Sequence, residues 1–181
     1  MDSDGSTTVV LTVASAAWRD ALGDPEPLAR RIVGATLARA SGAAWLEAAE
    51  ISLLLTDDRE IRSLNAAYRS KDRATNVLSF PGLDLVDGAT DIPPPPDRAL
   101  LGDIVISLDR LRAEAAAERK ALCDHFAHLL VHGTLHLLGY DHDDDARAEV
   151  MEGLEASILE TLGFAAPYAP ASEADAVDAV T

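Results

Sequence analysis

Three histidines occur in VHGTLHLLGYDH, a stretch that otherwise reads as an apolar helix. His132 and His136 are four residues apart, so on a helix they lie one turn apart on the same face. This is the spacing by which one helix offers two nitrogen ligands to a metal. Gly139 can end the helix in a left-handed conformation, and His142 can then approach the same point from another direction. Three neutral imidazoles leave one position of a tetrahedral zinc ion open, which is typical of a catalytic zinc site.

Other polar residues near this string have less certain roles. A single histidine on an apolar helix is usually structural, and only the complete string HxxxHxxGxxH favours a metal site here. His128, one turn before His132, is predicted to be structural or to join a network around the ligands. His125, which follows an aspartate, is predicted to be exposed or capping. Asp141 and the aspartates at 143–145 can accept hydrogen bonds from the outer ring nitrogens of the ligands.

The residue after the first histidine decides which hydrolytic chemistry is available. Metzincin proteases have the same ligand spacing in HExxHxxGxxH, and their glutamate is the general base that acts on the zinc-bound water. In this sequence the position is Gly133. A peptidase mechanism therefore has no proton acceptor in the string, and the sequence argues against proteolysis.

A second group of candidate residues lies in LNAAYRSKDRATNVLSFP, residues 64–81. Arg69, Lys71 and Arg73 alternate between the end of a helix and the start of a strand, and Asp72 offsets one charge. In a chain of net charge −16 this local basic cluster stands out. Two interpretations are open. The cluster is either a solvated loop in which an arginine pairs with Asp72, or a phosphate-binding loop, which requires it to lie near the histidines.

The elements that position these residues follow from periodicity and turn signals. The predicted strands are 8–14, 51–56, 76–80 and 103–107. One predicted helix begins at Asp24-Pro25 and ends at Gly42, and another is capped by Asp57 or Asp58; further helices are predicted at 108–120, 121–138 and 144–162. This order indicates one α+β domain, residues 1–163, with a small four-stranded mixed sheet covered by helices. The metal site would lie at the end of the helix 121–138.

Two segments are predicted not to pack against this domain. The stretch 82–99 contains four consecutive prolines and reads as a mobile excursion, and the acidic tail 164–181 reads as disordered. The net charge of −16 argues against a generic nucleic-acid binder, whose footprint is normally basic. Because both segments carry part of that charge, the acidity weakens a nucleic-acid function without excluding it.

The compartment is predicted from three absences in the sequence. The single cysteine, Cys123, excludes an intrachain disulfide and suits a reducing compartment. No apolar run approaches the ~20 residues of a membrane span, and the acidic N-terminus is unlike a signal peptide. We therefore expect a soluble, cytoplasmic protein.

Three motifs together resemble the YbeY family, bacterial metal-dependent endoribonucleases also described as ribosomal RNA maturation factors. They are LNxxYRxKDxxTNVLSFP at 64–81, LGDIVIS at 101–107 and HGxLHLLGYDH at 132–142. Met151 and Glu155 also fit the closing helix of that family. The resemblance covers roughly residues 50 to 163, in the same order and spacing.

The resemblance implies a function and roles for individual residues. It implies a zinc ion, or another divalent transition metal, on His132, His136 and His142, and an RNA-contacting catalytic Arg69. Lys71 and Arg73 are predicted to bind the substrate because they belong to the same basic cluster as Arg69, and the resemblance itself assigns them no role. The implied activity is cleavage of single-stranded RNA in maturing the 3′ end of small-subunit ribosomal RNA and in ribosome quality control, with ribosome-associated proteins as partners. The alternatives are a metallohydrolase acting on a peptide or small ester and a non-catalytic assembly factor with a structural metal. The general base and the oligomeric state are not predicted.

Overall fold

The computed structural model describes residues 7–88 and 93–168. Within them the chain forms β1 (Thr8–Val13), α1 (Ala17–Leu22), α2 (Pro25–Ala40), a 3-10 turn η1 (Ala44–Ala48), β2 (Glu50–Thr56), α3 (Asp58–Arg69), β3 (Val77–Pro81), β4 (Leu100–Ser107), α4 (Leu108–Glu118), α5 (Leu122–Leu137) and α6 (Asp145–Leu162). The predicted α+β class is confirmed. The short elements α1 and η1 were not predicted from the sequence, and β4 begins three residues earlier than expected.

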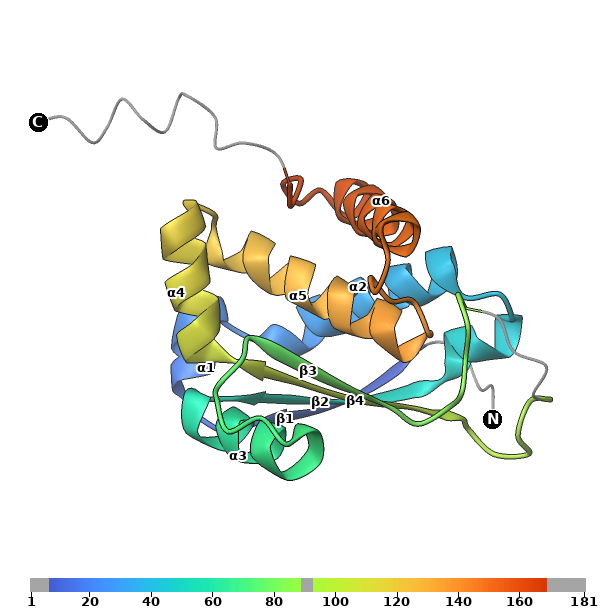
Figure 1. Ribbon diagram of the computed structural model, residues 1–181, viewed down its shortest axis with the longest axis horizontal. Coiled ribbons are helices and arrows are strands. Elements are labelled where there is room, and N and C mark those ends of the chain that lie inside the picture. Colours follow the sequence, from blue (N-terminus) through green and yellow to red (C-terminus); the bar gives the residue numbers. More distant parts are fainter. Residues whose placement is uncertain (1–6, 89–92, 169–181) are drawn as a thin grey trace, which may run out of the picture.

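The described strands form one mixed sheet in the order β1-β2-β4-β3. β1, β2 and β4 run parallel, and β3 pairs with β4 in the antiparallel direction. Parallel neighbours need a crossover connection, and the helices supply these connections. Helices α2 and α5 cover one face of the sheet with α6 outside them, and α3 lies on the opposite face (Figure 1).

Helix α5 is the central element of the core. Most of its residues are buried because it packs against α2, α4, α6 and the sheet at the same time. Gly133 lies on the side of α5 that packs against β3 and β4. A Cβ at this position would stand 3.1 Å from Ile104 Cγ2 and 3.2 Å from Ser79 Oγ. The glycine that replaces the protease glutamate is therefore a packing residue, and any larger side chain there would have to push Ile104 and Ser79 aside.

The segment after β3 packs more closely than expected. Gly139 ends α5 with φ +85°, and an added Cβ would come within 1.9 Å of the Leu85 carbonyl oxygen. Leu85 is buried, and the Gly88 amide donates to the Leu138 carbonyl at 2.8 Å. The prediction of a mobile excursion is therefore wrong for residues 82–88, which close over the end of α5. Residues 89–92 of this stretch lie outside the described residues.

The beginning of the acidic tail also differs from the prediction. Phe164 packs against the core, with the guanidinium carbon of Arg31 5.9 Å from its ring centroid. Pro167 is buried, and Tyr168 contacts α6. Residues 164–168 are thus ordered, and the remainder of the predicted tail, 169–181, lies outside the described residues. In the described part of the chain, every helix is too short or too polar to cross a membrane.

Candidate metal centre

The three predicted metal ligands converge on one point. His132 and His136 come from the last turns of α5, and His142 comes from the turn that leads into α6. One ring nitrogen from each lies within 4.8 Å of the others, and the Nε2 atoms of His132 and His136 are 3.0 Å apart. A tetrahedral zinc with bonds of about 2.0–2.1 Å holds its nitrogen ligands about 3.3 Å apart. The cluster therefore fits such an ion after small adjustments of the rings.

A buried carboxylate on α6 orients the first of these ligands. His132 Nδ1 lies 2.6 Å from Glu155 Oε1, and because a carboxylate only accepts, the imidazole donates this bond. The proton on Nδ1 leaves Nε2 free to face the metal position, as in many carboxylate–histidine–metal arrangements. Burial raises the pKa of Glu155, but hydrogen bonds from His128, His132 and Tyr168 outweigh it and bring the pKa down to about 2. Glu155 is therefore an anion at neutral pH.

The aspartate predicted for this role has another partner. Asp141 lies in the turn before α6, and its Oδ2 accepts a hydrogen bond of 2.5 Å from Nη1 of Arg147, in the first turn of α6. The structure thus gives the orienting role predicted for Asp141 to Glu155, which lies on a different element.

The electrostatic surroundings of His136 favour metal binding. Burial lowers its pKa to about 4, and the neighbouring His132 and His142 contribute in the same direction. At neutral pH the ring is uncharged and keeps a lone pair, which is the form that binds a metal.

Arg69 faces the same hollow as the histidines. A cavity of about 280 Å³ is lined by Arg69, Asn76, Val77, Leu78, Ser79, Pro81, His132, His136 and His142. Arg69 ends α3, its Nη2 donates to the Ser79 carbonyl at 2.5 Å, and its guanidinium carbon lies 5.6 Å from the Phe80 ring centroid. Asp72 instead pairs with Arg62 at 2.8 Å. Arg69 is therefore not the solvated partner of Asp72 that was the alternative interpretation.

The other two basic residues of the loop do not line this cavity. Arg73 lines a separate, wider hollow beside α3, together with Arg59, Arg62 and Arg110. Lys71 is exposed just after the end of α3, and its amide donates to the Asn65 carbonyl. Of the predicted basic cluster, only Arg69 is brought to the histidines.

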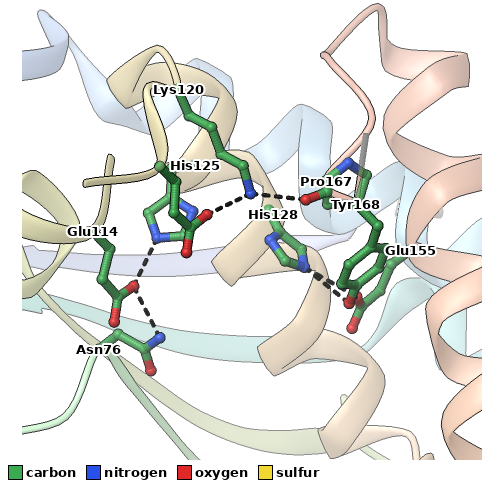
Figure 2. A network of polar contacts seen from close by, with 9 residues as sticks. Asn76, Glu114, Lys120, His125, His128, Glu155, Pro167 and Tyr168 are labelled. Carbon is green, nitrogen blue, oxygen red and sulfur yellow. Dashed lines mark hydrogen bonds and ion pairs between the residues drawn. The ribbon is translucent and has the colours of Figure 1, made fainter. Parts of the chain in front are cut away.

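The two remaining histidines of α5 belong to a polar network beside the metal cluster, shown in Figure 2. His128 Nε2 donates to Glu155 Oε2 at 3.0 Å, so His128 joins the network around the ligands. His125 is only 4% exposed and donates from Nε2 to Glu114 Oε2 at 2.7 Å. The prediction that His125 is exposed or capping is wrong, because α4 covers it with Glu114.

The fold and this site together define a class of protein. It is an α+β domain in which three histidines, oriented by a buried glutamate, open into a cavity beside an arginine. The position that supplies the general base in zinc proteases is a packing glycine.

Comparisons with known proteins identify the family. The family model described as Endoribonuclease YbeY matches residues 24–163. The chain is 46% identical over 175 residues to the Endoribonuclease YbeY of Dinoroseobacter shibae, covering 92% of this chain and 93% of that protein. It is also 46% identical over 165 residues to that of Nitrobacter winogradskyi, covering 90% and 82%. The chain therefore belongs to the endoribonuclease YbeY family. The predicted family and the prediction of an endoribonuclease are confirmed, and the dependence on zinc stays a prediction.

A solved structure supports the fold independently. The solution structure of a Thermotoga maritima protein matches with a TM-score of 0.51 over 90% of this chain and 99% of that one. The sequence identity is 16%, so this likeness concerns the fold alone.

Proposed function

We propose that this protein is a zinc-dependent endoribonuclease that cuts single-stranded RNA. Its proposed roles are the maturation of the 3′ end of small-subunit ribosomal RNA and ribosome quality control. The observation that carries the proposal is one shared cavity, which both the three histidines and Arg69 line. A metal ion and a guanidinium are the two kinds of positive charge that stabilise a phosphodiester as it gains negative charge in the transition state.

The metal would be held by His132, His136 and His142, with one ion per chain. Three imidazole nitrogens form a donor set that suits zinc and other divalent transition metals. When bound, the ion supplies Lewis-acid chemistry toward the phosphate and toward water. Glu155 holds His132 in the tautomer whose Nε2 is free, and the lowered pKa of His136 keeps that ring neutral.

Arg69 is the proposed catalytic residue that contacts the phosphate. A guanidinium has five N–H donors in a fixed fork, so Arg69 can keep its bond to the Ser79 carbonyl and still offer donors to the substrate. The Ser79 carbonyl and the Phe80 ring hold the guanidinium at the cavity wall, which reduces the reorganisation needed when the phosphate arrives. A flexible single strand can bring one phosphate into a hollow of 280 Å³ more easily than a stacked duplex can.

Lys71 and Arg73 would bind the RNA strand beyond the scissile phosphate. Arg73 shares its hollow with Arg59, which gives this side of α3 positive charge in a chain of net charge −16. Contacts of this kind add affinity for the phosphate backbone without adding sequence specificity. The proposed substrate is ribosomal RNA, the proposed partners are ribosome-associated proteins, and the proposed location is the cytoplasm. Residues 1–163 are proposed to form one domain.

A peptidase function is disfavoured by Gly133. A glycine carries no carboxylate, so the general base of the zinc proteases is missing from this position. A glutamate there would also need to displace Ile104 and Ser79.

The test is cleavage of a labelled single-stranded RNA and of the matching duplex, with metal removed by a chelator and then restored with zinc. We expect cleavage of the single strand only, loss of activity on chelation and recovery with zinc. His136→Ala should lose most of the bound zinc, because two imidazoles hold the ion poorly. His128→Ala keeps all three ligands and should still bind about one equivalent. Cleavage that persists in the metal-free protein, or metal-dependent cleavage of unfolded casein, would contradict the proposal.

A further inference from the structure

The chain that follows α6 returns to the metal centre. After Gly163 it runs past Phe164 to Pro167, whose carbonyl accepts a hydrogen bond of 2.8 Å from Lys120 Nζ. This bond ties the segment to the end of α4. Tyr168 then points toward α6, beside His128 and Glu155 (Figure 2).

The hydroxyl of Tyr168 reaches the carboxylate that orients the first metal ligand. It donates to Glu155 Oε2 at 2.5 Å and lies 3.5 Å from His128 Nε2. Glu155 therefore has a donor on Oε1, from His132, and two on Oε2, from His128 and Tyr168. Burial and the bond to Glu155 both raise the pKa of Tyr168, so the hydroxyl keeps its proton and acts as the donor.

Hydrophobic packing of the ring alone does not explain why Tyr168 lies here. The residue is 53% exposed, and its ring meets His128 edge-on with the centroids 5.5 Å apart. The carboxylate of Glu155, by contrast, is almost fully buried at 1% exposure. An anion in such a place needs donors on both oxygens, and each donor restricts its rotation. The hydroxyl thus makes the hydrogen bond that holds Tyr168 to α6.

We propose that Tyr168 is a positioning residue of the metal centre, which acts through Glu155 on the orientation of His132. The Tyr168 hydroxyl fixes Oε2 so that Oε1 stays aligned with His132 Nδ1, and His132 Nε2 stays aimed at the metal position. This inference rests on the proposed three-histidine metal site. It extends that site to the segment 164–168, which lies beyond the family match that ends at residue 163.

The test is zinc affinity, measured in the full-length chain by competition with a chromogenic chelator. Tyr168→Phe removes only the hydroxyl and should weaken zinc binding roughly tenfold, at the lower end of the range for groups that orient metal ligands. Glu155→Gln should weaken it by about 10- to 100-fold. The cobalt-substituted Tyr168→Phe protein should show a shifted visible absorption band. Tyr68→Phe is the matched control, because Tyr68 is an exposed tyrosine on α3. The Tyr68→Phe protein should bind zinc as the wild type does.

A double-mutant cycle separates positioning from a general structural effect. If Tyr168 acts through Glu155, then Tyr168→Phe should cause little further loss of affinity in the Glu155→Gln background. Wild-type affinity in Tyr168→Phe, or the same loss in both backgrounds, would overturn the inference. Failure of the wild-type protein itself to bind zinc would instead refute the proposed metal function. The two failures are therefore distinguishable without an RNA assay.

Discussion

Replacement of Arg69 by alanine should slow RNA cleavage while metal content stays unchanged. Arg69 lines the cavity of the three histidines, and its described hydrogen bond goes to the Ser79 carbonyl rather than to a metal ligand. Removing one preorganised donor to a developing oxyanion typically costs about 10²- to 10³-fold in rate, or about 2.7–4 kcal/mol. Arg69→Lys should recover part of the loss, because an ammonium cannot make the bidentate contact of a guanidinium. Arg69→Glu should be slower than Arg69→Ala, because it repels the phosphate.

The same change also removes a hydrogen bond from the fold, so the assay must separate the two effects. The lost bond to Ser79 should lower the free energy of unfolding by about 1.5–3 kcal/mol, as for other hydrogen bonds of charged groups. Single-turnover cleavage with saturating zinc, at a temperature well below unfolding, measures the catalytic loss alone. Arg30→Ala removes the same charge from an exposed ion pair on α2 and is the matched control.

Two results would refute the reasoning about Arg69. One is an Arg69→Ala rate equal to that of the wild type, which would make the arginine a structural anchor of β3. The other is an equal loss in Asp72→Ala, because the structure pairs Asp72 with Arg62 and leaves Arg69 independent of it.

Two further predictions concern packing and pH. Gly133→Ala should lower the free energy of unfolding by about 1–3 kcal/mol, because the added methyl crowds β3 and β4. Gly153→Ala adds its methyl in open space on α6 and should raise the free energy of unfolding by up to about 1 kcal/mol. Thermal unfolding of both variants checks this, and equal shifts in the two would contradict the packing role of Gly133. The pKa of Glu155 falls from 4.5 to about 2 in the folded protein, so its ionisation stabilises the fold above pH 4.5 and this contribution is lost as the pH falls from 4.5 to 2. Denaturant unfolding of the metal-free protein measures this as the stability difference between wild type and Glu155→Gln. The difference should be at most about 3 kcal/mol above pH 4.5 and should shrink as the pH falls toward 2. A difference that stays constant with pH would refute the lowered pKa of Glu155.

The sequence predicts best those features that depend on neighbours along the chain. The ligands His132, His136 and His142 lie within one helix end and its turn, so their spacing alone brings them together. Long helices and β-branched strands were located from periodicity, with ends that differ by a few residues. Arg69 was singled out through the family resemblance, since charge alone did not distinguish it from Lys71.

Features that depend on contacts between distant segments were missed or wrong. His125 was misjudged because only the folded chain shows that α4 covers it. Leu85 and Gly139 meet across more than fifty residues, so the closure of 82–88 over α5 has no local signal. Glu155, in contrast, does have a local signal in the sequence. It stands four residues after Met151 and three before Ile158, inside the buried stripe of α6. A charged residue in such a stripe needs a buried partner.

The glycine inside the histidine string explains how one ligand spacing can serve a different chemistry. Gly133 lets α5 lie against Ile104 and Ser79 with no side chain between them, and Ser79 is also the residue whose carbonyl receives Arg69. Ser79 Oγ in turn donates to the Gly133 carbonyl at 3.2 Å, which ties the strand that carries the arginine contact to the helix that carries the ligands. A glutamate in place of Gly133 would add a base but would separate these two elements. The close approach that excludes the protease base is therefore the same one that brings the arginine to the histidines.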